Sequence, residues 1–330
     1  MKLNQLESKI HTYIKNIRKK INSEESISLA SDIYMIDEII KLLNLDINVP
    51  EEMIIFSDEN DLLIDEDPNF WINYNEMYET NKSISKLYKH LPNLTYNPTF
   101  SMINIENILI LLSNFFSLYD KNIFNHYKKV LDKKLIYICP NIEDAYAKTF
   151  TLNSEKCSYI LISKENQNIL FAQTLAHEII HSYINTFLYD ISPKERFKYH
   201  INSLDEVYSH FIELIFIDYL KKINYDKKEI KNLKDYTNFT LGYYLSSFGE
   251  VFKNKDDLNL EDYIIYENYS YGMLIAFHYY INYHKNPDKT KQDILNMTLN
   301  SASKDKHFLL NNYSLSEEDI CNPKILTKLS

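Results

Sequence analysis

The sequence predicts a mainly helical fold with one small β-sheet. Only three glycines and eight prolines occur among 330 residues, and a chain rich in strands and tight turns would need more of both. Apolar residues recur at three- and four-residue spacing in several long segments, which is the spacing of a helix with one buried face. Two short runs of β-branched and aromatic residues interrupt this pattern and predict the strands.

Residues 1–130 are expected to form a helical N-terminal region. Helical spacing of apolar residues covers segments 27–45 and 103–130, so both predict helices. The stretch 57–69 is acidic, and the stretch 91–98 is rich in Asn and Pro. Such compositions between periodic segments are typical of loops.

Residues 131–330 are expected to form a second domain. The strands are predicted at 135–139 and 158–163, where apolar β-branched and aromatic residues are bounded by polar ones. Helices follow to the end of the chain, and the segment 269–283 predicts a helix that faces the core. Prolines are expected to break these helices at three positions: Pro193, Pro287 and Pro323.

Composition bounds the functional class. The net charge of −10 disfavours a surface that binds nucleic acid. The N-terminal residues contain no apolar run typical of a signal peptide, and the apolar run 108–112 is too short to span a bilayer. The three cysteines follow no metal-binding or disulfide pattern, and we expect reduced thiols in a soluble cytoplasmic protein without membrane contact: Cys139, Cys157 and Cys321.

The segment 175–181 reads Leu-Ala-His-Glu-Ile-Ile-His and contains the motif H-E-x-x-H. Because four residues make about one helical turn, His177 and His181 stack on one face and both imidazoles can reach one metal. Zinc accepts two such nitrogens and needs a third protein ligand and a water. Glu178 is placed to act as general base toward that water. The alternative is an amphipathic helix with these side chains on its wet face, but the flanking residues are apolar.

No third His follows the motif at the spacing H-x-x-G-x-x-H, so the third ligand must lie further along the chain. The segment 204–216 predicts a buried helix on which Glu206, Ser209, His210 and Glu213 share one polar stripe, at i, i+3, i+4 and i+7. We expect Glu206 to be the third ligand. Glu213, Ser209 or His210 would then hydrogen-bond the ligands and fix their orientation.

These residues resemble the thimet-oligopeptidase and oligoendopeptidase F group of zinc peptidases. That family places a Glu twenty-five residues after the second His of H-E-x-x-H, followed by a Ser three residues and a Glu seven residues later. The same spacing relates His181 to Glu206, Ser209 and Glu213. The resemblance implies a short or distant member of the gluzincin type, with one zinc per chain held by His177, His181 and Glu206. It also implies Glu213 as the supporting carboxylate and cleavage of short peptides.

The segment 266–273 is similar to a tyrosine-containing region of the same family, whose hydroxyl groups hydrogen-bond the carbonyl oxygen of the bond that is cleaved. The resemblance implies that Tyr269 or Tyr271 has this role.

A small sheet directly before the H-E-x-x-H helix is the zincin arrangement, so residues 131–330 are expected to form a zincin-like catalytic domain. The edge strand of such a sheet can pair with an extended peptide. The strand 158–163 is the candidate, with Tyr159, Ile160 and Leu161 as substrate-binding residues. A strand in the core of the sheet is equally compatible with its sequence.

The sequence therefore predicts a zinc metallopeptidase in which Glu178 activates the water held by zinc. A Tyr hydroxyl, or a His such as His210, would stabilise the oxyanion. Three alternatives remain: a dedicated protease for a single protein target, a non-catalytic zincin fold that only binds peptides, and a helical protein with an accidental motif. The intact Glu178 argues against a non-catalytic site.

Overall fold

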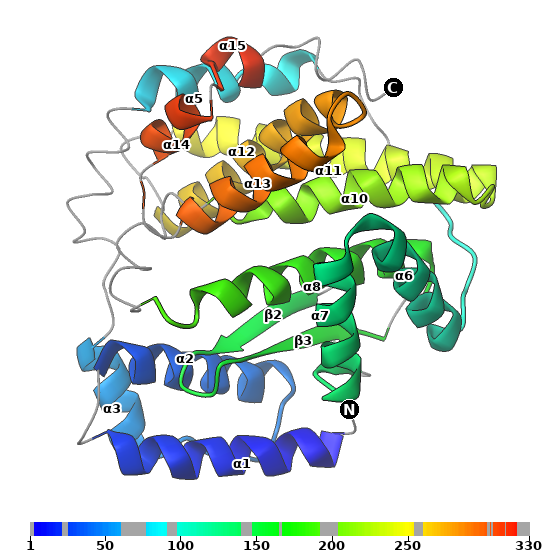
Figure 1. Cartoon of the computed structure of the whole chain (residues 1–330). Coiled ribbons are helices and arrows are strands. Elements are labelled where there is room, and N and C mark those ends of the chain that lie inside the picture. Colours follow the sequence, from blue (N-terminus) through cyan, green and yellow to red (C-terminus); the bar gives the residue numbers. More distant parts are fainter. Residues whose placement is uncertain are drawn as a thin grey trace. The chain divides into compact units, whose positions relative to one another are not determined.

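The computed structural model describes residues 3–21, 26–60, 77–90, 98–139, 147–164, 167–191, 204–253, 260–301, 304, 306–313 and 315–321. Within these residues the protein is mostly helical (Figure 1) and has one three-stranded sheet. The predicted fold class, mainly α with a small β-sheet, is confirmed.

The chain divides into two compact units. Unit 1 comprises residues 1–63 and 102–194, and unit 2 comprises residues 64–101 and 195–330. Each unit is therefore built from two separate stretches of the sequence. The predicted division at residue 130, into a helical region and a catalytic domain, stays a prediction.

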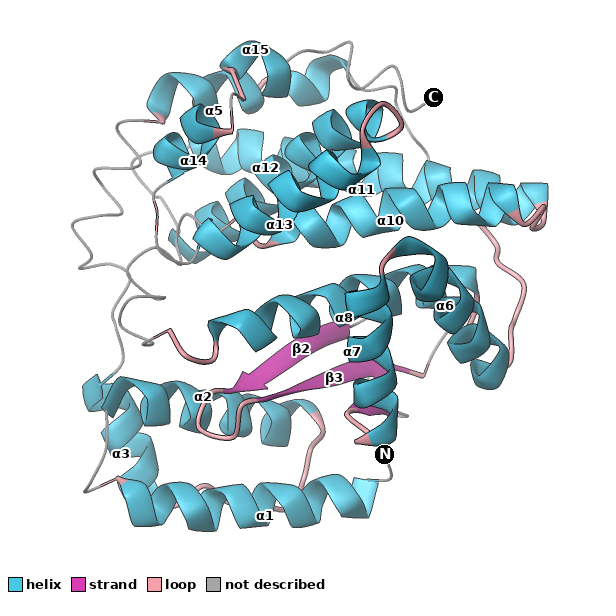
Figure 2. Cartoon of the chain, in the orientation of Figure 1, coloured by secondary structure: helices cyan, strands magenta, loops and turns pink. Residues whose placement is uncertain are grey.

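Unit 1 combines helices with the sheet. Its described elements are α1 (Leu3–Lys20), α2 (Ser26–Leu42), α3 (Glu51–Asn60), α6 (Ile105–Tyr119), α7 (Lys121–Asp132), β1 (Ile136–Cys139), β2 (Ala147–Leu152), β3 (Cys157–Ser163) and α8 (Ile169–Leu188). Figure 2 shows the sheet between α8 and α2. Both helices pack on strand β2, and α8 also packs on β3.

The predicted helical segment 103–130 forms two helices rather than one. The backbone of Asp120 is extended, with φ −155° and ψ 127°, so α6 ends before it and α7 begins after it. The Asp120 carboxylate accepts hydrogen bonds from the backbone N–H groups of Asn122 and Ile123 at 2.8 and 3.2 Å. This capping satisfies donors that a helix start leaves without partners.

Part of the predicted loop 57–69 is helical, because α3 continues to Asn60. The hydroxyl of Ser57 donates a hydrogen bond to the carbonyl of Ala30 at 3.1 Å, which ties this end of α3 to α2. The remaining residues 61–69, and residues 91–97 of the second predicted loop, lie outside the described residues.

The sheet has the strand order β1-β3-β2. β1 pairs with β3 in parallel, and β2 pairs with β3 in antiparallel orientation. The prediction of strands at 135–139 and 158–163 is confirmed, whereas β2 is an additional strand. β3 is the central strand, and its main chain is paired on both sides. The edge role predicted for residues 158–163 is therefore wrong, and among the described strands the antiparallel edge is β2.

Several turns place a residue other than glycine at positive φ: Asn44 (47°), Lys134 (54°), Lys156 (46°) and Asn224 (55°). The three glycines of the chain all lie inside described helices, and none of them has a positive φ. Glycine is therefore not used for turns in the described part of this protein.

Unit 2 is helical throughout its described part. Its elements are α5 (Tyr78–Ile84), a 3₁₀ turn (Leu87–His90), α10 (Glu206–Lys222), α11 (Lys227–Lys253), α12 (Leu260–Tyr283), α13 (Pro287–Ser301), α14 (Lys306–Asn312) and α15 (Glu317–Ile320). α12 packs against α10, α11 and α13. The predicted core-facing helix 269–283 lies in α12, and Pro287 begins α13. The other predicted breaks, Pro193 and Pro323, lie outside the described residues.

A buried ionic network holds α12 to two other helices of unit 2. The Lys306 side chain is 1% exposed, and its Nζ lies 2.9 Å from Oε2 of Glu267 and 4.3 Å from the ring centre of Tyr271. The side-chain amide of Asn81, in α5, donates to Oε1 of Glu267 at 2.9 Å and to the hydroxyl of Tyr263 at 2.7 Å. The Tyr271 hydroxyl donates to Oδ1 of Asn81 at 2.5 Å. These contacts fix α12 relative to α5 and α14.

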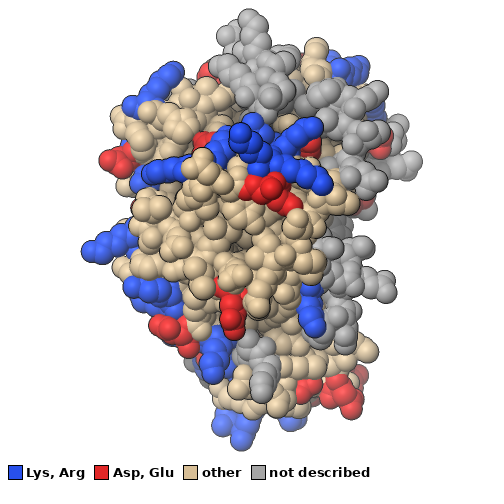
Figure 3. Space-filling view, turned by 90° about the vertical axis from the view of Figure 1, so that its right-hand side faces the viewer, with Lys and Arg blue, Asp and Glu red and all other residues tan. Residues whose placement is uncertain are grey.

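The ends of α10 and α11 on either side of the turn between them carry several exposed lysines: Lys221, Lys222, Lys227, Lys228 and Lys231. Figure 3 shows basic side chains, in blue, gathered on the face of unit 2 that includes this turn, with acidic side chains, in red, beside them. Lys221 Nζ, for example, lies 2.5 Å from Oδ1 of Asp218. Among the described residues, no helix has both the length and the apolar character that crossing a bilayer requires.

Candidate active site

Helix α8 carries the H-E-x-x-H residues on a firmly packed support. The helix begins after Asn168, whose side chain accepts a hydrogen bond from the backbone N–H of Phe171 at 3.1 Å. It packs against β2, β3, α6 and α7, and most of its side chains are buried. The predicted apolar environment of the motif is therefore present in unit 1.

His177 and His181 lie one turn apart on the same face of α8. Their Nε2 atoms are 3.0 Å apart, and the ring centres are 4.8 Å apart. The His177 residue is buried, with 8% of its surface exposed. Two imidazoles that converge through the same ring nitrogen form a ready pair of metal ligands.

Glu178 is oriented by the sheet. The hydroxyl of Thr149, in β2, donates to Oε2 of Glu178 at 2.7 Å and lies 3.1 Å from the Glu178 carbonyl oxygen. The Glu178 residue is buried, with 6% exposed, so this hydrogen bond restricts its rotamer. Sequence reasoning missed Thr149, although the alternation of Phe150 and Leu152 with polar residues is a strand signal.

A second buried His supports α8 from α7. His126 Nε2 lies 3.0 Å from the Ser182 hydroxyl, directly after His181 in the sequence. Burial, together with a smaller effect of the positive charge of Lys129, lowers the pKa of His126 to about 4. The His126 ring is therefore neutral at neutral pH, and its Nε2 can accept the proton of the Ser182 hydroxyl. This contact holds the turn of α8 that contains His181, the second His of the motif, against α7.

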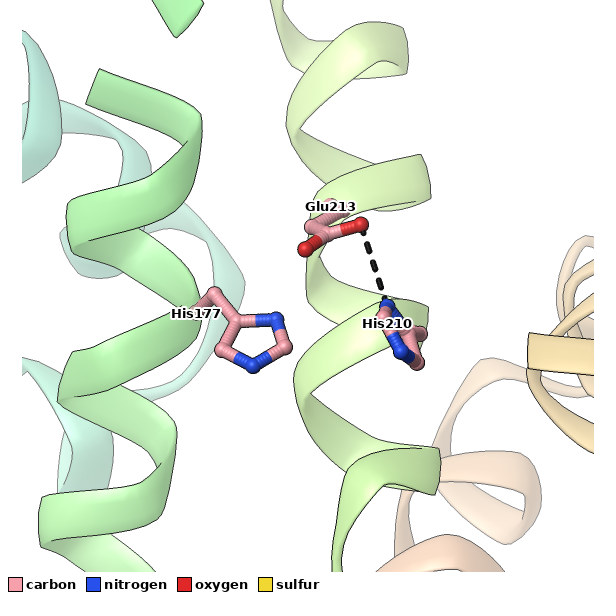
Figure 4. A group of neighbouring side chains, drawn as sticks. All are labelled: His177, His210 and Glu213. Carbon is pink, nitrogen blue, oxygen red and sulfur yellow. Dashed lines mark hydrogen bonds and ion pairs between the residues drawn. The ribbon is translucent and has the colours of Figure 1, made fainter. Parts of the chain in front are cut away.

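Helix α10 of unit 2 carries the predicted polar stripe. His210 lies between two carboxylates of the same helix: its Nδ1 is 3.2 Å from Oε2 of Glu213 and its Nε2 is 3.8 Å from Oε2 of Glu206. Figure 4 shows the first of these interactions. Ser209 is fully buried, and its hydroxyl makes no hydrogen bond within the described part of the chain.

Two tyrosines from α11 and one from α12 surround this stripe. The Tyr269 ring centre is 5.8 Å from that of His210, and Tyr269 stacks on Tyr244 at 4.4 Å with the rings 8° from parallel. Burial raises the pKa of Tyr244, and the negative charge of Glu206 raises it further. Burial also raises the pKa of Tyr236, with a further contribution from Glu213. Both phenols are therefore protonated donors at neutral pH.

The two predicted oxyanion tyrosines have different surroundings. Tyr271 is fully buried, and its hydroxyl is bound to Asn81, away from the stripe of α10. Tyr269 is half-buried and contacts His210. Sequence reasoning missed Tyr244 and Tyr236, because only the packing of α11 on α12 brings them to the stripe and nothing local in their sequence marks them.

The predicted substrate-binding residues lie in the core of unit 1. Tyr159, Ile160 and Leu161 are at most 2% exposed, because β3 is the central strand. The Tyr159 hydroxyl is hydrogen-bonded to that of Tyr13, in α1. Strand β2 lies at the edge of the described sheet and carries Thr149, which is hydrogen-bonded to Glu178.

Both units contain described residues that are candidate metal ligands. Unit 1 supplies the imidazoles of His177 and His181, and unit 2 supplies the side chains of Glu206, His210 and Glu213. Nitrogen and carboxylate oxygen donors of this kind suit zinc. The cysteines do not contribute: Cys139 and Cys157 are in the sheet, and burial raises the pKa of both thiols.

Comparison with known proteins identifies the fold. No protein-family model matches the sequence, and no curated protein matches it. Among solved structures, the chain is similar to a protein from Bacillus anthracis str. Ames described as a candidate oligoendopeptidase F, with a TM-score of 0.55 and 14% identity over 91% of this chain and 63% of the other. It is also similar to PZ peptidase A, with a TM-score of 0.53 and 11% identity over 91% of this chain and 64% of the other.

The chain therefore spans somewhat less than two thirds of the length of both structures. At this level of identity the likeness concerns the fold. The protein therefore shares its fold with the candidate oligoendopeptidase F and with PZ peptidase A.

Proposed function

We propose that this protein is a zinc-dependent metallopeptidase that hydrolyses peptide bonds. The observation that carries the proposal is the geometry of α8, where His177 and His181 converge through Nε2 at 3.0 Å and the buried Glu178 between them is held by Thr149. The similarity to an oligoendopeptidase F and to PZ peptidase A supports a peptide as the substrate.

The ligand geometry fits zinc. Two nitrogens that each lie 2.0–2.1 Å from a tetrahedral zinc are separated by about 3.3 Å, and the two Nε2 atoms require only a small adjustment from 3.0 Å to reach this value. We propose Glu206 of α10 as the third ligand. Glu213 and His210 would then act together, since His210 already contacts both carboxylates and can orient the ligand by hydrogen bonding.

The roles of the chain's own residues follow from their contacts. Zinc, when bound, would polarise the peptide carbonyl and raise the acidity of a water molecule. The Glu178 carboxylate takes the proton from the attacking water and delivers it to the amine nitrogen as the peptide bond breaks. The Thr149 hydroxyl keeps Oε2 of Glu178 in one position, which limits the reorganisation that proton transfer needs.

We assign the oxyanion donor to Tyr269 rather than to Tyr271. The Tyr271 hydroxyl is used within unit 2, where it is bound to Asn81, and Tyr271 has no exposed surface. Tyr269 lies against His210 and is backed by Tyr244, so its ring is held at the stripe that carries Glu206. A phenol in this position can donate to developing negative charge.

We also propose that an extended peptide pairs with the main chain of β2. An edge strand offers free N–H and C=O groups at two-residue intervals, and β2 carries Thr149 beside the general base. The chemistry is compatible with a broad oligopeptidase or with a dedicated protease for one protein. Cleavage of many unrelated short peptides would favour the first, and cleavage of a single protein would favour the second. A cytoplasmic site of action, with no nucleic-acid partner, stays part of the proposal.

Elemental analysis of protein purified without added metal tests the metal. We expect about one zinc per chain in the wild type and its loss in His177→Gln and Glu206→Ala. His126→Gln is the matched control, because His126 is another buried His against α8 and should leave zinc bound. Absence of zinc from the wild type, even after dialysis against zinc, would overturn the proposal.

Quenched fluorescent peptides test the reaction. Glu178→Gln should retain zinc and lose cleavage, since the amide cannot accept the proton. Equal cleavage by the wild type and Glu178→Gln would show that the activity comes from a contaminant or from another site.

A further inference from the structure

Gly272 of α12 touches the proposed third ligand. A Cβ atom at this position would lie 2.6 Å from Cβ, 3.3 Å from the backbone carbon and 3.5 Å from Cα of Glu206. The optimal separation of two nonbonded carbon atoms begins at about 3.5 Å. An alanine at position 272, whose Cβ would lie 2.6 Å from Cβ of Glu206, would therefore force the two residues about 0.9 Å further apart. α10 and α12 reach this close approach because residue 272 has no side chain.

α12 is the rigid partner in this contact. The residue before Gly272 is Tyr271, which is bound to Asn81 through its hydroxyl and is covered by the Lys306 ammonium. One turn earlier, Glu267 is paired with the same Lys306 at 2.9 Å. To move α12 away from α10 would strain this buried network, and buried ionic networks resist partial loss of their contacts.

Glu206 is the softer partner. It is the first residue of α10, and the preceding Asp205 makes no side-chain capping hydrogen bond. The first turn of a helix lacks part of the internal hydrogen bonding that holds later turns. A steric conflict at this contact would therefore be relieved by movement of the Glu206 backbone and side chain.

We propose that Gly272 is a positioning residue that sets the location of the Glu206 carboxylate for zinc. Metal ligands function only within about 0.2 Å of their ideal distances, whereas the displacement at the Cβ of Glu206 would be several times larger. The inference rests on the proposed function, because Gly272 can position a zinc ligand only if Glu206 binds the metal. Gly272 itself touches neither metal nor substrate.

A second glycine provides a matched control. Gly249, in α11, also faces a rigid neighbour: a Cβ there would lie 2.6 Å from the carbonyl oxygen of Ser85. Gly249→Ala creates a conflict of the same severity in the same unit, but away from Glu206. Gly272→Ala and Gly249→Ala should therefore both lower the stability of unit 2, and only the first should weaken zinc binding.

The experiment measures zinc affinity by competition with a chromophoric chelator, beside thermal unfolding in the absence of zinc. We expect Gly272→Ala to weaken zinc about 10- to 100-fold, as changes in groups that orient a ligand do, and Gly249→Ala to change it less than about threefold. In a Glu206→Ala background, Gly272→Ala should cause no further loss of affinity, because it acts through Glu206.

The outcomes separate the two proposals. A wild type that binds no zinc refutes the proposed function. A wild type that binds zinc while Gly272→Ala keeps its affinity refutes the positioning role. Equal losses from Gly272→Ala with and without Glu206 also refute it, since the effect would then come from the fold of unit 2. In the zinc-free protein, a Glu206→Gly substitution should restore part of the stability that Gly272→Ala loses, which reports the steric contact directly.

Discussion

Replacing Lys306 with Met should strongly destabilise unit 2. The Lys306 and Glu267 side chains are 1% and 6% exposed, so the substitution leaves a carboxylate buried without its cation. Breaking a buried ion pair from one side costs about 3–5 kcal/mol. The methionine fills the volume of the lysine stem, so the loss comes mainly from the uncompensated charge rather than from a cavity.

Two details of the network refine this magnitude. Glu267 keeps one strong donor, the Asn81 amide at 2.9 Å, and a weaker one, the Tyr263 hydroxyl at 3.4 Å, which moderates the cost. The Lys306 ammonium also lies 4.3 Å from the Tyr271 ring centre, and a desolvated cation–π contact contributes about 2 kcal/mol. The loss in free energy of unfolding should therefore fall in the upper half of the range of about 3–5 kcal/mol.

Urea unfolding followed by circular dichroism measures this loss, with hydrogen exchange of α12 and α14 to locate it in unit 2. Lys82→Met is the control, since Lys82 pairs with Glu79 at 3.1 Å while 42% and 74% exposed, and exposed pairs contribute at most about 1 kcal/mol. Adding Glu267→Gln to Lys306→Met should recover much of the stability, because no charge then remains buried. A loss in Lys306→Met as small as that in Lys82→Met would refute the reasoning.

Three further predictions concern the candidate site. Thr149→Val should reduce kcat about tenfold while zinc content stays unchanged, because only the orientation of Glu178 is lost; a parallel loss of zinc would point to a disturbed α8 instead. The pKa of His126 is lowered from 6.5 to about 4 in the folded protein, so as the pH falls this side chain is protonated at a higher pH in the unfolded chain than in the folded chain. Stability should therefore be full above pH 6.5 and fall by up to about 3 kcal/mol between pH 6.5 and 4, and His126→Gln should remove this part of the pH dependence in thermal unfolding. Tyr269→Phe should lower kcat about 10- to 100-fold with little change in KM, whereas Tyr271→Phe should lower the unfolding temperature and leave kcat close to that of the wild type.

The helices were the most predictable part of the fold. The apolar spacing of 27–45 and 269–283 corresponds to α2 and part of α12, because a buried helical face leaves a repeating trace in the sequence. The break at Asp120 is local as well, and its capping side chain is visible in the sequence. The order of the strands is not local. β3 is central because β1 and β2 pair with its two edges. The amino-acid composition of such a central strand does not differ from that of an apolar edge strand, so composition did not predict its position in the sheet.

The candidate site shows the same limit. His177, Glu178 and His181 are marked by their spacing within one helix, and so is the stripe of α10. Thr149 and Tyr244 reach these groups from elements that are distant in the sequence, and His126 does so from α7. Their positions depend on how these elements pack together. No short sequence pattern predicts that packing. The close approach of Gly272 and Glu206 belongs to this second class.

The placement of glycine has a consequence for the unfolded chain. Left-handed turn positions are occupied by Asn44, Lys134, Lys156 and Asn224, although a left-handed conformation costs most residues other than glycine about 1–2 kcal/mol. Glycine would avoid that cost in the folded state but would make the unfolded chain more flexible, and this extra entropy is worth about 0.4–1 kcal/mol at each position. The entropy of the unfolded chain therefore offsets roughly half of the cost in the folded state. A chain with so few glycines has comparatively low conformational entropy in the unfolded state. It loses less entropy on folding, and this contributes to its free energy of unfolding.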